Sequence, residues 1–207
     1  EVGHNFPDIQ TITIPGGGFV IEFTSGMMDF VYAVARGLSG RFIRDTAAGP
    51  ENQAALALPE VERQIAKIFM QWKWYKRWLW KLRRIKYPQF DITEGVHKWA
   101  EGIATVAELF MLAHEIGHIV LEKKILPPRT ANAEQDADTI AMMLVVKLAN
   151  KRGEDPAFIF AGAVFAIRIF AGLEKVGVRF SSVYPPQAER IANISACVLS
   201  LCPSRQY

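Results

Sequence analysis

The sequence predicts a mainly helical α+β protein with a small β-hairpin at its N-terminal end. Residues 9–14 and 19–23 alternate apolar and polar side chains on either side of a turn rich in proline and glycine, which is the pattern of a hairpin. From residue 59 onward, apolar residues recur at helical spacing in long segments separated by prolines and glycines. Half of the 207 residues are hydrophobic and 22% are charged, which is the composition of a globular protein and excludes a disordered or fibrous one.

The length favours one large domain, with room for a small appendage. We expect residues 1–90 to form the hairpin and a helical region, either within the same domain or as a subdomain. Residues 91–207 are expected to form the region that carries the chemistry. The two cysteines, Cys197 and Cys202, exclude a disulfide scaffold and are expected to be reduced.

In the N-terminal part, residues 27–38 predict a short apolar helix after the hairpin. Residues 39–58 are rich in Gly, Ala and Asn and predict a loop with weak helical content. Residues 59–87 then form a long helical pattern, which Pro88 ends.

The helix that follows is expected to begin at a capping pair, Asp91 and Glu94, and to reach about Lys123. Asn132 is the predicted N-cap of the next helix, whose first turns are acidic, and Gly153 is its predicted end. These caps place two long helices one after the other, with a proline-containing turn between them.

The last part of the chain predicts two further helices. Asp155 and Pro156 begin the first of them, over the apolar run 157–173. Arg168 interrupts this run, so we expect a buried core helix and not a membrane span. The final helix follows a turn at residues 184–186 and continues to about Leu201.

Residues 114–118 read His-Glu-Ile-Gly-His, and this motif carries the clearest chemical signal in the chain. On a helix, His114 and His118 lie one turn apart on the same face, where both imidazoles can bind one Zn²⁺ ion. Glu115 projects roughly 100° away around the helix, so it can take a proton from a metal-bound water instead of binding the metal. The alternative is a helix that carries two histidines by chance. Two of the four histidines of the chain lie here, beside an apolar stripe, which favours the metal site.

Two carboxylates at the start of the next helix complete the predicted site. Glu134 is the candidate for a third ligand, because the intervening turn can bring its helix back against the first and leave a fourth position for water. Asp138 lies four residues further on the same face, where it can accept a hydrogen bond from the far nitrogen of a liganding histidine. The alternative is that these acids only complement the helix dipole.

The pattern His114-Glu115-x-x-His118, followed by Glu134-x-x-Ala137-Asp138 on the next helix, resembles the gluzincin zinc metallopeptidases. It is most similar to the soluble relatives of the HtpX / CAAX prenyl endopeptidase family, over about residues 97–195. The resemblance implies a zincin-like metallopeptidase domain with one Zn²⁺ ion held by the two histidines and Glu134. It also implies hydrolysis of peptide bonds by a metal-activated water, with Glu115 as general base.

Two departures from the family pattern limit what the resemblance implies. Tyr184 stands before Pro185-Pro186, where the family often has a histidine, and Glu189-Arg190-Ile191 follows as it often does in the family. The Tyr184 phenol can donate a hydrogen bond to a catalytic oxyanion, or it can simply pack against the prolines, and both interpretations stay open. The membrane helices of the membrane-bound relatives are absent, so catalysis within a membrane is not implied.

Residues 71–87 combine four of the five tryptophans of the chain with several lysines and arginines and contain no acid. An amphipathic basic helix of this kind fits an anionic membrane surface or a partner protein. Contact with nucleic acid is less favoured. The remaining interpretation is a long helix that packs within the protein, with lysine stems covering the aromatic rings.

These features together predict a zinc endopeptidase that acts on a peptide or protein substrate, which could pair with an edge strand of the hairpin. The alternative is a non-enzymatic membrane- or protein-interaction module built on a metallopeptidase fold. No signal peptide is visible at the start of the sequence, so a cytoplasmic location is expected, with membrane association through residues 71–87 as an addition.

Overall fold

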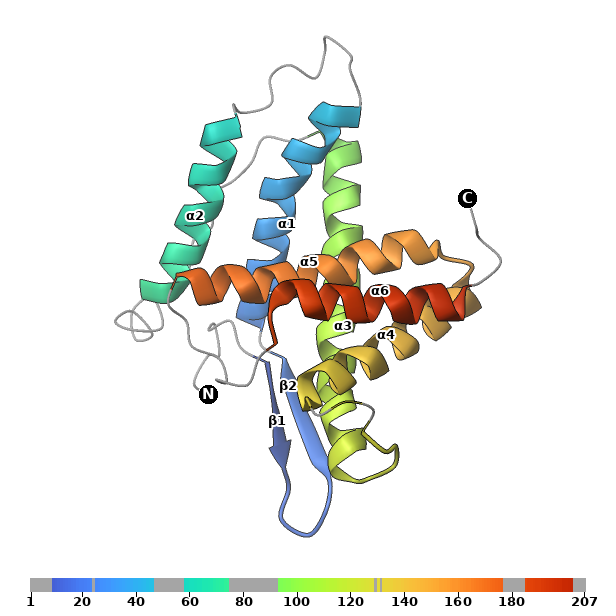
Figure 1. Cartoon of the computed structure of the whole chain (residues 1–207). Helices are drawn as coiled ribbons and strands as arrows, with labels where there is room; N and C mark the ends of the chain where they lie inside the picture. Colours follow the sequence, from blue (N-terminus) through green and yellow to red (C-terminus); the bar gives the residue numbers. More distant parts are fainter. Residues whose placement is uncertain are drawn as a thin grey trace.

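The computed structural model describes residues 9–23, 25–46, 58–74, 93–128, 130, 132–176 and 185–202. Within these ranges, six helices accompany one two-stranded antiparallel sheet (Figure 1). The elements are β1 (Ile9–Thr13), β2 (Phe19–Phe23), α1 (Ser25–Thr46), α2 (Leu58–Trp74), α3 (Glu94–Glu122), α4 (Ala133–Arg152), α5 (Pro156–Lys175) and α6 (Gln187–Leu201). The prediction of a mainly helical protein with a small N-terminal sheet is confirmed.

The β1–β2 hairpin has the predicted strands and turn. Ile9 pairs with Phe23 at one end of the ladder and Thr13 pairs with Phe19 at the other. The turn contains Gly16, Gly17 and Gly18, with φ angles of 94°, 102° and 129°. Side chains other than glycine rarely adopt these angles, so the glycine run is what allows the chain to reverse here.

Helix α1 is longer than predicted, because it continues to Thr46 where the sequence indicated a loop from residue 39. Ser39 is buried within it, and its hydroxyl donates a hydrogen bond to the carbonyl of Ala35 at 2.6 Å. The apolar face of α1, including Phe30 and Val34, packs in the core. Tertiary packing and this satisfied hydroxyl outweigh the weak helical propensity of the segment.

Helix α2 agrees with the start of the predicted helix over residues 59–87. Its Ile68 and Phe69 lie in the core, and the Phe69 ring meets Phe30 of α1 edge-on, with centroids 5.4 Å apart. The remainder of that predicted helix, with most of the basic tryptophan-rich segment, lies outside the described residues.

The helix ends follow the predicted signals with one correction. The N-cap of α3 is Thr93, whereas Asp91, the predicted cap, lies outside the described residues. Asn132 caps α4, because its side-chain oxygen accepts hydrogen bonds from the backbone N–H groups of residues 134 and 135, and Gly153 ends that helix in the left-handed conformation with φ 71°. Asp155 caps α5 with Pro156 in the first turn, as predicted.

Helix α3 is the centre of the fold. It stands upright in Figure 1, where α4, α5 and α6 cross it and the hairpin descends beside its lower half. One hydrophobic cluster joins α3 to α1, α2, α4, α5 and α6. A Cβ atom at Gly162 of α5 would lie 2.3 Å from a methyl of Val106, so α5 approaches α3 too closely there for any larger residue. The part of α3 that carries the histidine motif lies between α4 and the hairpin, and α3 contacts both.

Helices α3 and α5 are long and apolar enough to cross a membrane, by length and composition alone. Half of the apolar window of each is buried inside the protein. Core helices of water-soluble proteins meet the same criteria, so the two helices are weak evidence for association with a membrane.

Candidate metal centre

The structure brings His114, His118 and Glu134 together. One ligand atom from each lies within 4.8 Å of the others. The Nε2 atom of His114 is 3.2 Å from one oxygen of Glu134, and the Nε2 atom of His118 is 3.6 Å from the other. Two imidazole nitrogens and a carboxylate at these separations could bind one metal ion.

The hydrogen bonding of this cluster is incomplete, and a metal ion would complete it. The two Nε2 atoms face each other at 3.1 Å, so at most one of them can serve as the acceptor of a hydrogen bond from the other. Oε2 of Glu134 is buried, and although Nε2 of His114 lies 3.2 Å from it, this contact does not have the geometry of a hydrogen bond. Buried polar atoms without partners are rare in native proteins, and such an atom next to two histidine nitrogens fits a divalent cation with nitrogen and oxygen ligands.

Close packing of α3 against α4 places Glu134 beside the histidines. Gly117 lies within the motif on α3, and a Cβ atom added to it would sit 2.9 Å from both the Cα and the carbonyl oxygen of Ala137 on α4. Only glycine allows this approach without moving a backbone. We assigned no role to Gly117 from the sequence, although an isolated glycine inside a helical pattern is the usual signal of such a contact.

The start of α4 is also held by its own side chains. The backbone N–H of Thr130 donates to the carboxylate of Asp136 at 3.0 and 3.2 Å, and Asn132 caps the first turn. Asp136 is 2% exposed, so this link between the turn and the helix is shielded from water. Together these bonds fix the first turn of α4, which carries Glu134.

Behind the cluster, Asp138 connects His114 to a buried arginine. Oδ1 of Asp138 lies 2.9 Å from Nδ1 of His114, where it can accept a hydrogen bond from this nitrogen. Arg190 of α6 donates to both oxygens of Asp138, at 2.7 and 2.8 Å. Asp138 is 0% exposed and Arg190 is 4% exposed. The sequence showed Arg190 only as part of a family pattern, and nothing in it indicated that α6 returns to this carboxylate.

The buried charges shift the pKa values of the cluster strongly. Burial disfavours the charged form of His114, but the hydrogen bond to Asp138 and the adjacent Glu134 carboxylate outweigh burial and raise the pKa of His114 to about 9. Burial raises the pKa of the Glu134 carboxyl, whereas the adjacent His114 and His118 imidazoles lower it far below its usual value. Burial likewise opposes ionisation of Asp138, and Arg190 with His114 still holds the pKa of Asp138 low. Without a metal, His114 therefore retains a proton between two carboxylates.

We expect the affinity for a divalent ion to rise with pH, because His114 must lose its proton to bind metal. The folded-state pKa of His114 is raised from 6.5 to about 9. Its protonation therefore stabilises the metal-free fold below pH 6.5, and this contribution disappears as the pH rises through about 9. Within that window, the apparent association constant should increase up to about ten-fold per pH unit. Competition of Zn²⁺ against a chromogenic chelator, measured from pH 6.5 to 8.5, tests this. An affinity that does not change with pH would contradict it.

The sequence also predicts Glu115 and Tyr184 as residues of the site. Glu115 lies on α3, half-buried, and Oε2 of its carboxylate accepts a hydrogen bond from the hydroxyl of Thr11 on β1 at 2.8 Å. Tyr184 lies outside the described residues, so its role stays a prediction.

Comparison with known proteins gives one match. A family model described as Peptidase U49 matches residues 45–200 of the chain. The matched stretch covers most of the chain and contains the whole cluster with Asp138 and Arg190, whereas the hairpin lies before it. No curated protein and no solved structure matches the chain.

Proposed function

Because the chain belongs to the peptidase U49 family, we propose that it is a zinc endopeptidase whose metal ion is held by His114, His118 and Glu134. A peptidase of this family acts on peptide or protein substrates. The observation that carries the choice of a metallopeptidase is the convergence of two histidine nitrogens on Glu134, with one buried carboxylate oxygen left without a hydrogen-bond partner. The resemblance to the gluzincins, which rests on the same residues, favours zinc as the ion.

Each residue of the site has a role in this proposal. When bound, Zn²⁺ would lower the pKa of a water molecule and polarise the peptide carbonyl. Asp138 keeps the proton of neutral His114 on Nδ1, so that its Nε2 lone pair is free for a metal. Arg190 keeps Asp138 ionised in its buried position. This chain of contacts fixes the orientation of His114.

Glu115 is the proposed general base. Its carboxylate accepts a proton from the attacking water as the water oxygen bonds to the peptide carbon. The same proton then goes to the amide nitrogen as the carbon–nitrogen bond breaks, which gives a carboxylic acid and an amine. Tyr184 remains a candidate donor to the oxyanion that forms between these two events.

The hairpin is the proposed place for the substrate backbone. The contact of Thr11 with Glu115 puts β1 beside the proposed base. Among the described residues, β1 and β2 pair only with each other, so each strand has an edge on which an extended peptide could add.

Removal of the metal tests the proposal. We expect the purified chain to contain about one zinc per molecule and to hydrolyse fluorescently labelled casein, used here as a general protein substrate. A chelator should abolish this hydrolysis, and added Zn²⁺ should restore it, because the ion supplies the activated water. Elemental analysis and the rate of fluorescence release measure both effects. A folded chain that binds no zinc, or hydrolysis that survives the chelator, would contradict the proposal.

A further inference from the structure

Thr11 of β1 contacts the proposed catalytic base, Glu115, although about half of the chain separates the two residues. Its hydroxyl donates a hydrogen bond to Oε2 of Glu115 at 2.8 Å, and the two residues are 104 positions apart. The Glu115 side chain forms no other hydrogen bond or ion pair with the residues that the structure describes. Thr11 also lies outside residues 45–200, the stretch that the family model matches. The hydrogen-bond donor to Glu115 therefore comes from a segment that lies N-terminal to the stretch matched by the family model.

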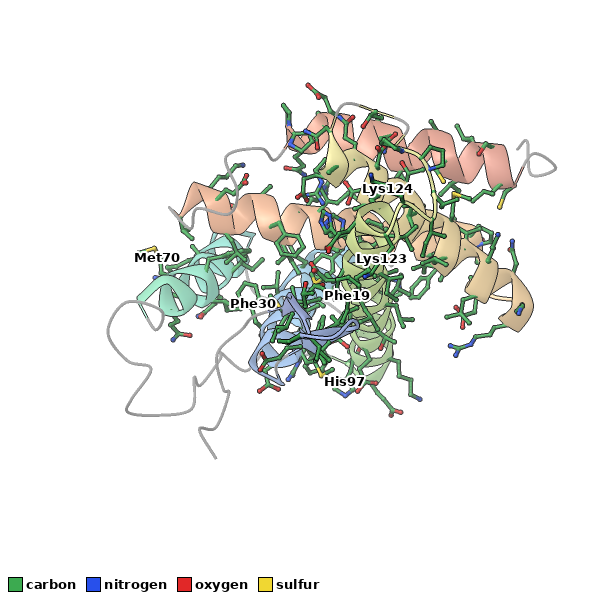
Figure 2. All side chains as sticks on the ribbon, turned by 90° about the horizontal axis from the view of Figure 1, so that it is seen from below. Phe19, Phe30, Met70, His97, Lys123 and Lys124 are labelled. Atoms are coloured by element: carbon green, nitrogen blue, oxygen red, sulfur yellow. The ribbon has the colours of Figure 1, made fainter. Side chains whose placement is uncertain are left out.

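The docking of the hairpin onto α3 explains why Thr11 reaches Glu115. Side chains alternate between the two faces of a strand, and Ile12 next to Thr11 is 43% exposed, so Thr11 points the opposite way, toward α3. A second contact lies further along the hairpin, where Nζ of Lys123 is 4.9 Å from the centre of the Phe19 ring. Figure 2 shows Phe19 and Lys123 close together in the view from below. Two contacts on one face hold the hairpin against the end of α3 that carries the motif.

We propose that Thr11 is a positioning residue for Glu115, an inference that rests on the proposed function. The hydroxyl engages one carboxylate oxygen and leaves the other to receive the proton of the attacking water. A glutamate side chain has several rotatable bonds, and holding it in one rotamer removes an entropic cost from each turnover. The hairpin thus has two roles. It offers a strand edge to the substrate, and it orients the side chain of Glu115.

Three substitutions in the full-length, zinc-loaded chain test this inference. Thr11→Val keeps the shape and the strand preference of the residue but removes the hydroxyl. Thr11→Ser keeps the hydroxyl. Thr105→Val makes the same chemical change at an exposed position of α3, outside the hairpin, where the side chain forms no hydrogen bond with the described residues, so it is the matched control.

We expect Thr11→Val to lower kcat for labelled casein about ten-fold, the order expected for loss of one hydrogen bond to a charged group. KM and zinc content should not change, because the backbone of the edge strand and the proposed metal ligands are not altered. Thr11→Ser should restore most of kcat, and Thr105→Val should match the wild-type chain. A change that merely weakened the fold would also change the unfolding midpoint, and serine would not rescue it.

A second measurement does not depend on activity. Three-bond NMR couplings of the Glu115 side chain, in the zinc-loaded protein, report whether it occupies one rotamer or several. We expect one rotamer in the wild type, Thr11→Ser and Thr105→Val proteins, and averaged couplings in Thr11→Val. Couplings that stay the same in Thr11→Val would overturn the inference.

The activity results separate this inference from the proposed function. If wild type is active and Thr11→Val retains its kcat, the positioning role is wrong and the peptidase proposal stands. If Thr11→Val is faster than wild type, the Thr11 hydroxyl inhibits Glu115 instead of positioning it for catalysis. This result also overturns the inference. A zinc-loaded wild-type chain that hydrolyses nothing overturns the proposed function, and the positioning role with it.

Discussion

Replacing Glu115 by glutamine is expected to reduce peptide hydrolysis by roughly 10²–10⁴-fold while the protein stays folded and retains its zinc. Glutamine has nearly the same shape and can still accept the hydrogen bond from Thr11, but it cannot accept a proton at neutral pH. The proposed ligands, His114, His118 and Glu134, are not touched by the change. The rate of casein hydrolysis, the zinc content and the unfolding midpoint of the variant should all be measured against wild type.

Glu122→Gln provides the control for this prediction. It makes the same chemical change on the same helix, at an exposed residue at the C-terminal end of α3. It should leave hydrolysis unchanged. If Glu115→Gln hydrolyses casein as fast as Glu122→Gln does, Glu115 is not the base. If neither variant nor wild type hydrolyses it, the interpretation as a non-enzymatic interaction module gains support.

Replacing Arg190 by methionine is expected to lower the free energy of unfolding by about 3–5 kcal/mol, the usual loss when one partner of a buried ion pair is removed. Arg190 donates two hydrogen bonds to Asp138, and both residues are almost completely buried. Methionine fills much of the same space but leaves the Asp138 carboxylate with His114 as its one remaining partner in the described structure. Urea unfolding of the metal-free protein measures the loss without any contribution from bound zinc.

Arg152→Met is the matched comparison for Arg190→Met. Arg152 lies at the exposed end of α4, where its guanidinium is 3.8 Å from Glu154. Surface ion pairs of this kind contribute about 0–1 kcal/mol, so the variant should unfold almost like wild type. Equal losses in the two variants would show that the Asp138–Arg190 pair is not the strong link between α4 and α6 that its geometry indicates.

Some features of this protein follow from local chemistry, and these could be predicted from the sequence. The hairpin comes from two alternating segments around a glycine run, and the helix ends come from Asn132, Gly153 and Asp155. These signals involve only neighbouring residues. Their physical causes, which are φ preferences and capping hydrogen bonds, do not depend on the rest of the fold.

The length of α1 was missed because it depends on packing. Glycines and a serine around residue 39 predict a loop on propensity alone. In the fold, however, α1 is pressed against α3, and the hydroxyl of Ser39 is satisfied by a carbonyl one turn before it. Burial of an apolar face contributes more to helix stability than local propensity does.

The sequence by itself determined which groups can do chemistry, since helical geometry alone places His114 and His118 on one face with Glu115 turned away from them. Only the tertiary structure decided what surrounds those groups. The approach of α4 over Gly117, the return of Arg190 to Asp138 and the reach of Thr11 to Glu115 all join segments far apart in the chain. Such contacts arise from how helices pack, and packing is decided by the shape of the whole core, which no short stretch of sequence contains.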